Sequence, residues 1–145
     1  MQTVEAVARL QEGMHFEVEA GSGHQVALDM LDDAERIDGK LGGGFSPMEM
    51  VLVALAGCLG ITVLSIIRKR KVEVTGYELR VRGERASSHP KVFVEIVVEH
   101  VLTGQGIKPE AVERAIELAE TRYCPVSIML SKTATIRQIM RIVEV

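Results

Sequence analysis

The segment from Met50 to Ile67 constrains the fold more than any other part of the chain. It carries no charged residue, and only Thr62 and Ser65 bring hydroxyl groups. A helix that is apolar on all sides must be covered on all sides, and a single sheet of this chain covers only one face. Two interpretations follow. The segment either crosses a bilayer, for which it is barely long enough, or lies as a central helix between two subunits. The amphipathic strands around it favour the second.

Clear signals mark both ends of this helix. Ser46 is a candidate N-cap, Pro47 suits the first helical position, and Glu49 stands where a capping box needs an acid. At the other end, the cations of residues 68–71 suit a helix C-terminus. The sequence therefore predicts that the helix begins at Pro47.

The rest of the chain reads as strands and two shorter helices. Alternation of apolar and polar residues predicts strands, and helical spacing after a proline predicts helices. The expected strands cover residues 4–8, 15–20, 24–30, 72–86, 91–102 and 133–145, and the expected short helices residues 109–120 and 126–131. Residues 31–45 are expected to form a polar loop. The order βββ-α-ββ-αα-β predicts one α+β domain over residues 1–145.

Composition and charge exclude some classes of function. The net charge of -3 argues against a general nucleic-acid binder, which needs a basic surface. The first ten residues carry Glu5 and Arg9 and lack an apolar leader. Together with a total of two cysteines, this predicts a cytoplasmic protein in a reducing compartment. The histidines share no ligand spacing with either cysteine, so we expect no metal site.

Three motifs are similar to those of one known family. They are residues 44–49 (GFSPME), residues 54–58 (ALAGC) and residues 122–127 (RYCPVS). They resemble the OsmC/Ohr superfamily, and most closely its small OsmC-like branch. The resemblance implies an intertwined homodimer in which two central helices pack together inside sheets from both chains. It also implies reduction of organic hydroperoxides without metal, flavin or haem, with an external dithiol as the reductant.

The resemblance assigns roles to the two cysteines. By motif, Cys58 takes the peroxidatic position, where it attacks the peroxide oxygen. Cys124 takes the resolving position, where it condenses with the oxidised Cys58 to a disulfide. A peroxidatic cysteine must be a thiolate, and family members supply an arginine for this purpose, held by a glutamate near the start of the central helix.

Glu49 is the candidate for that glutamate, although it does not match the family pattern. Met48 occupies the place directly after the proline, and Glu49 comes one residue later. One residue is about 100° of helix rotation, so Glu49 is equally well explained as a capping residue. Arg9 and Arg36 are the upstream candidates for the arginine, and neither lies in a recognisable motif.

Other interpretations stay open at this point. Cys58 has an ordinary explanation as core packing, because free cysteines are among the most buried residue types. A second function is a non-enzymatic dimer that binds a small hydrophobic ligand near Cys58. A membrane anchor is the third.

Overall fold

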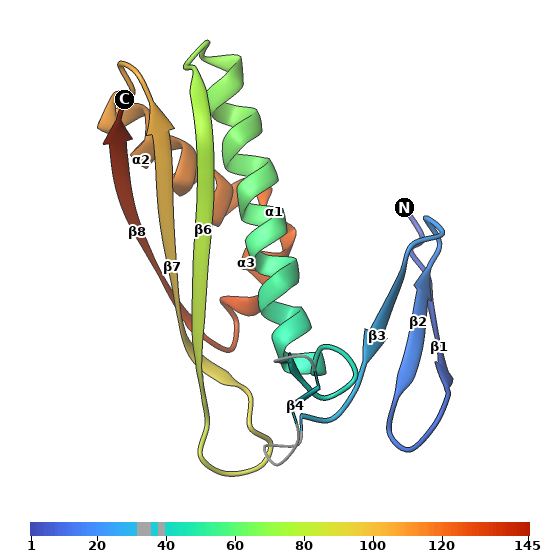
Figure 1. Cartoon of the computed structure of the whole chain (residues 1–145). Coiled ribbons are helices and arrows are strands. Elements are labelled where there is room, and N and C mark those ends of the chain that lie inside the picture. Colours follow the sequence, from blue (N-terminus) through green and yellow to red (C-terminus); the bar gives the residue numbers. More distant parts are fainter. Residues whose placement is uncertain (32–35, 38–39) are drawn as a thin grey trace. The chain divides into compact units, whose positions relative to one another are not determined.

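The computed structural model describes residues 1–31, 36–37 and 40–145, with the backbone alone at positions 36, 37 and 41. It contains two compact units, residues 1–51 and residues 52–145 (Figure 1). The mixed α+β class predicted from the sequence is confirmed. The prediction of a single domain over the whole chain stays a prediction.

The first unit is built on a three-stranded antiparallel meander. Its strands are β1 (Ala6–Leu10), β2 (Phe16–Ala20) and β3 (Gln25–Leu28), in the spatial order β1-β2-β3. The turns between them use Gly13 and Gly23 at positive φ, a region that glycine enters at little cost. The three strands predicted from alternation are thus confirmed, with shifts of a few residues at their ends.

The prediction of an unstructured loop over residues 31–45 was wrong in part. Two short strands, β4 (Arg36–Ile37) and β5 (Lys40–Leu41), pair with each other in antiparallel fashion. Strands of two residues are too short to show a period, which explains why the pattern missed them. The remaining residues of the expected loop, 32–35 and 38–39, lie outside the described part.

The central helix α1 runs from Pro47 to Lys69. Its start is the predicted capping box: the backbone N–H of Ser46 donates to Glu49 Oε2 at 2.9 Å, and the N–H of Glu49 donates to Ser46 Oγ at 3.2 Å. At its other end Lys71 adopts a left-handed conformation with φ 58°, which terminates the helix. By length and composition alone, α1 would be able to cross a membrane.

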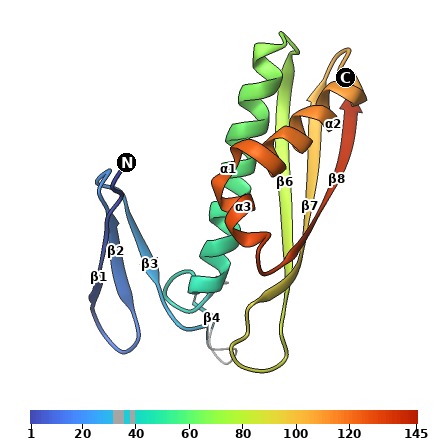
Figure 2. The same ribbon diagram turned by 180° about the vertical axis from the view of Figure 1, so that it is seen from behind.

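The second unit is a three-stranded sheet with helices on one face (Figures 1 and 2). Strands β6 (Val74–Arg85) and β7 (Phe93–Gly104) form the predicted antiparallel hairpin. Strand β8 (Thr135–Glu144) adds to β7 in parallel, a pairing that the sequence did not reveal. Helices α2 (Pro109–Leu118) and α3 (Pro125–Leu130) lie on the same side of the sheet as α1.

One side of α1 forms the core of this unit. Leu55, Leu59, Val63 and Ile67 recur every four residues and are almost completely buried. The same core contains buried residues of β7 and α2, which include Ile96, Val98, Leu102, Val112, Ala115 and Ile116. The opposite side of α1 is open in the single chain. Val53 is 46% exposed and Ile61 is 74% exposed, so the helix is not buried on all sides within this unit.

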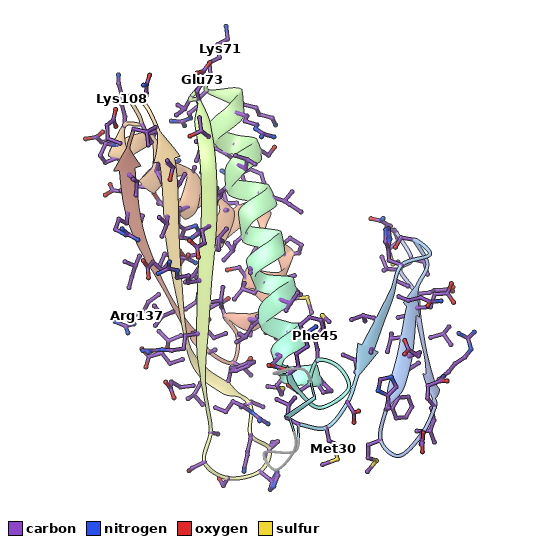
Figure 3. All side chains as sticks on the ribbon, in the orientation of Figure 1. Met30, Phe45, Lys71, Glu73, Lys108 and Arg137 are labelled. Atoms are coloured by element: carbon purple, nitrogen blue, oxygen red, sulfur yellow. The ribbon has the colours of Figure 1, made fainter. Side chains whose placement is uncertain are left out.

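The two faces of the sheet differ in character. The outer face carries ion pairs such as Arg137 with Glu95 at 2.9 Å, and the Arg137 side chain extends away from α1 (Figure 3). The inner face holds a buried polar network. His100 contacts Tyr77 through Nδ1 at 2.5 Å and Gln138 through Nε2 at 2.7 Å. Since Gln138 offers its carbonyl oxygen, Nε2 carries the proton, and the hydroxyl of Tyr77 donates to Nδ1.

Candidate functional site

A single wide helical turn presents Cys124. Helix α2 passes at Ala119 into a π-helix, η1 (Ala119–Tyr123), and the N–H of Cys124 closes this turn on the carbonyl oxygen of Ala119 at 2.8 Å. Cys124 itself is extended, with φ -92° and ψ 102°, as expected for a residue before proline. The sequence predicted an interruption here but not a π-helix, a form found frequently at functional sites.

The side chain of Cys124 caps the next helix. Its Sγ accepts a hydrogen bond from the N–H of Ser127 at 3.4 Å, and its carbonyl accepts from Ile128 at 3.1 Å. Cys124 therefore occupies the N-cap position of α3, with Pro125 in the first turn. Because the cap fixes the backbone on both sides, the sulfur is held in one place.

Cys58 lies against this sulfur. It comes from the middle of α1, 66 positions away in the sequence, and the two Sγ atoms are 2.9 Å apart. Both are free thiols. A disulfide has a bond length of about 2.05 Å, so closure needs a movement of roughly 1 Å or less. The structure thus brings together the two cysteines that the sequence singled out.

The two thiols differ in their surroundings. Cys124 is 0% exposed, and burial raises its pKa, with a further contribution from its hydrogen bond to Cys58. At neutral pH Cys124 is therefore a thiol, whose S–H donates to the sulfur of Cys58. Cys58 is only half-buried. The pair accordingly has one shielded member and one that a small molecule can approach.

A groove of about 510 Å³ runs along α1 beyond Cys58. Thr62, Ser65 and Lys69 line it and share with Cys58 one flank of the helix, at spacings of four, seven and eleven residues. Tyr123, the neighbour of Cys124, lines the other side. The walls are largely apolar, while Lys69 and Arg70 bring positive charge to one end.

The other predicted site residues belong to the first unit. Glu49 is engaged in the capping box with Ser46. Arg9 forms an exposed ion pair with Glu19 at 3.6 Å. Arg36 contributes its backbone to β4, and its side chain lies outside the described part. Roles for Glu49, Arg9 or Arg36 next to the thiols stay predictions.

Ser127 is the residue of this neighbourhood that sequence reasoning missed. It is 0% exposed and lies one helical turn after Cys124. Its place in the Cys-Pro-Val-Ser motif was the available signal, but the motif was used only to find the cysteine. Among the described residues, no group of three or more histidine, cysteine, aspartate or glutamate side chains is arranged to hold a metal ion.

The matches to known proteins together extend over nearly the whole chain. The family model described as OsmC-like protein matches residues 38–138. Protein YhfA of Escherichia coli strain K12 is 37% identical over 134 residues, which are 92% of this chain and 93% of YhfA.

Solved structures agree in fold. A hypothetical protein from Aquifex aeolicus superposes with a TM-score of 0.86 at 23% identity and covers 100% of this chain and 99% of its own. An organic hydroperoxide resistance protein OsmC from Legionella pneumophila superposes with a TM-score of 0.69 at 18% identity, over 97% of each chain. The predicted OsmC/Ohr fold is confirmed, and the chain belongs to the OsmC-like family.

Proposed function

We propose that this protein reduces organic hydroperoxides by thiol chemistry, as part of a defence against oxidative stress. The observation that supports this most is the 2.9 Å approach of the two sulfurs, one half-buried and one fully buried. Two cysteines kept only for packing need not place their sulfur atoms this close together. The fold relative from Legionella is described as an organic hydroperoxide resistance protein, which is consistent with this chemistry.

In the first step Cys58 is the nucleophile. Its thiolate attacks the outer oxygen of the hydroperoxide, the O–O bond breaks, and the alkoxide leaves as an alcohol after taking a proton. Cys58 becomes a sulfenic acid. The roles are assigned in this order because Cys58 is the accessible thiol and the S–H of Cys124 points at its sulfur.

In the second step Cys124 resolves the oxidised cysteine. The sulfur of Cys124 attacks the sulfur of the Cys58 sulfenic acid, a disulfide forms, and water leaves. An external dithiol then reduces the disulfide and returns both thiols. The residues need no resident cofactor for this cycle. The largely apolar groove, which Thr62 lines one turn after Cys58 on the same flank of α1, favours a hydroperoxide with a hydrophobic substituent over hydrogen peroxide.

The protein is proposed to work as a cytoplasmic homodimer without contact with a membrane or with nucleic acid. The open side of α1 carries Val53, Gly57 and Ile61, and small and apolar residues suit close packing of two helices. Its other side already lies in the core of the second unit, which supports a soluble protein over a membrane anchor. Light scattering on the purified protein tests this, and Val53→Glu, which changes an exposed residue outside the groove, should convert a dimer to monomer.

The test of the activity uses two serine variants. Reduced parent protein, Cys58→Ser and Cys124→Ser are mixed with cumene hydroperoxide and either dihydrolipoamide or dithiothreitol, and peroxide loss is followed. We expect Cys58→Ser to lose turnover almost completely, since no nucleophile remains. The proposal fails if Cys58→Ser consumes peroxide as fast as the parent.

A second function is supported by the groove itself. Its apolar walls and the positive charge of Lys69 and Arg70 at one end suit a molecule with an acyl chain and a carboxylate. In this case the protein is a non-enzymatic carrier of a small hydrophobic ligand. Native mass spectrometry of freshly purified protein separates the two functions, because a carrier retains a lipid-sized adduct that Lys69→Glu should weaken.

A further inference from the structure

The Ser127 hydroxyl is buried without a hydrogen bond. The residue is 0% exposed, and its Oγ has no partner within the part of the chain that the structure describes. Burying a hydroxyl without a partner destabilises a fold, and alanine would fill the same space at lower cost. Native proteins keep few such groups, and those they keep need an explanation beyond packing.

The position of Ser127 points to Cys124. It is the third residue of α3, counted from the N-cap, and its backbone N–H already donates to Cys124 Sγ at 3.4 Å. In a capping box the glutamate or glutamine at this position reaches back toward the N-cap residue, and Ser127 holds the same place relative to Cys124. Rotation about the single χ1 bond moves the hydroxyl between staggered positions. The N–H of Ser127 is thus engaged with this sulfur, and the hydroxyl is a second donor of the same residue, without a partner among the described residues.

We propose that the Ser127 hydroxyl donates a hydrogen bond to the sulfur of Cys124 while that sulfur attacks oxidised Cys58. This inference rests on the proposed redox function and adds a residue to its second step. The first step, in which Cys58 reacts, does not involve Ser127.

The chemistry of resolution explains the need for this donor. Cys124 loses its S–H proton as its sulfur bonds to Cys58, the S–O bond of the sulfenic acid breaks, and the hydroxide leaves as water with that proton. Cys124 Sγ therefore carries negative charge during this step. Burial opposes that charge and raises the pKa of this thiol. A hydrogen bond from a hydroxyl group stabilises the charged sulfur and offsets part of the cost of burial.

The experiment starts the second step without a peroxide. Treatment of the reduced protein with oxidised glutathione places glutathione on Cys58 as a mixed disulfide. Cys124 then attacks Cys58, the disulfide closes, and glutathione leaves with the proton of Cys124. Quenched-flow mass spectrometry measures this closure over a range of pH, in parallel with closure after one equivalent of cumene hydroperoxide.

Three variants isolate the effect of the Ser127 hydroxyl on the rate of disulfide closure. Ser127→Ala removes the hydroxyl, and Ser127→Thr keeps it. Ser131→Ala is the matched control, because Ser131 lies one turn further along, at the C-cap of α3, and its hydroxyl donates to the carbonyl oxygen of Ile128 at 2.8 Å. We expect closure in Ser127→Ala to slow roughly tenfold, since a donor to a charged sulfur is lost. Its pH profile should shift to higher pH, and Ser127→Thr should recover most of the rate.

The outcomes separate this inference from the proposed function. Equal closure rates in Ser127→Ala and the parent overturn the role of Ser127. So does slowing by the same factor at every pH together with a lowered melting temperature, because that result marks a structural defect. If the parent forms no sulfenic acid with the hydroperoxide while glutathione release is still slowed in Ser127→Ala, the proposed function fails and the role of Ser127 stands.

Discussion

The sulfur of Cys124 donates its hydrogen toward the sulfur of Cys58 across 2.9 Å, although the two residues are 66 positions apart. Their closeness depends on the interruption between α2 and α3, where the π-helix ends and Cys124 begins the next helix. In the proposed cycle, this arrangement gives reaction with the peroxide to Cys58 and disulfide formation to Cys124. Each of these roles can therefore be removed by a separate substitution.

The first prediction concerns Cys124→Ser. Without the resolving thiol, Cys58 should react once with cumene hydroperoxide and stop as a sulfenic acid, since the hydroxyl of serine does not displace water from sulfur. Mass spectrometry after dimedone treatment should find the adduct on Cys58 in this variant, and a disulfide without adduct in the parent. Adduct formation on Cys124 in the Cys58→Ser protein would reverse the assigned roles.

The second prediction concerns the start of α1. Ser46→Ala removes the oxygen that accepts from the Glu49 N–H at 3.2 Å, and loss of an N-cap costs about 1 kcal/mol of stability. Urea unfolding measures the loss. Glu49→Gln is the companion variant, because glutamine also serves in a capping box. It should lose little stability, and it should keep its peroxide turnover if Glu49 only caps the helix. A large fall in turnover at unchanged stability would give Glu49 a catalytic role.

Local signals in the sequence were enough to predict most of the elements. The start of α1 was predictable because Ser46, Pro47 and Glu49 all act within one turn. The β6–β7 hairpin was predictable from the alternation within each strand. The parallel pairing of β8 with β7 was not, since it joins strands separated by two helices and leaves no local pattern.

The site was predictable only in part. The cysteines were found through their motifs, but no pattern in the sequence gives the distance between two sulfurs. The π-helix before Cys124 covers only Ala119–Tyr123, and a segment this short leaves no helical period of its own in the sequence. Ser127 escaped notice because a serine in a short apolar helix looks like an ordinary first-turn residue, and its burial depends on the tertiary fold.

The third prediction concerns His15 in the first unit. Its Nδ1 lies 3.2 Å from Asp29 Oδ2 and its Nε2 lies 3.0 Å from Glu17 Oε1, so the ring faces a carboxylate on each side. The hydrogen bond to Glu17, followed by the one to Asp29, raises the pKa of His15. Stabilisation from the charged ring is fully present below about pH 6.5 and is lost as the pH rises through the folded pKa.

Two-dimensional NMR of the histidine rings measures that effect. His15 should titrate above the value of an unstructured histidine, and Glu17→Gln together with Asp29→Asn should return it toward that value. His24 is the control, because it is exposed and contacts the hydroxyl of Ser22 rather than a carboxylate. A pKa of His15 at or below that of an unstructured histidine would contradict the prediction.

The fourth prediction concerns His100, which should respond to pH with the opposite sign. Burial is the main cause that lowers its pKa, and the hydrogen bond to Gln138 offsets this only in part. Above about pH 6.5 the ring is neutral in both the folded and the unfolded chain, and stability does not depend on it. Below that pH the unfolded chain binds a proton at this ring, and the folded chain does not. The free energy of unfolding should then fall by up to about 1.4 kcal/mol per pH unit until the folded pKa is reached.

Urea unfolding of the parent, His100→Gln and His89→Gln at pH 7, 6 and 5 tests this sign. Glutamine at position 100 keeps hydrogen-bonding groups beside Tyr77 and Gln138 but takes up no proton, so this variant should lose less stability than the parent between pH 7 and pH 5. The exposed His89 serves as the control for replacing a surface histidine by glutamine. If parent and His100→Gln show the same slope, His100 is not the group that links folding to protons below pH 6.5.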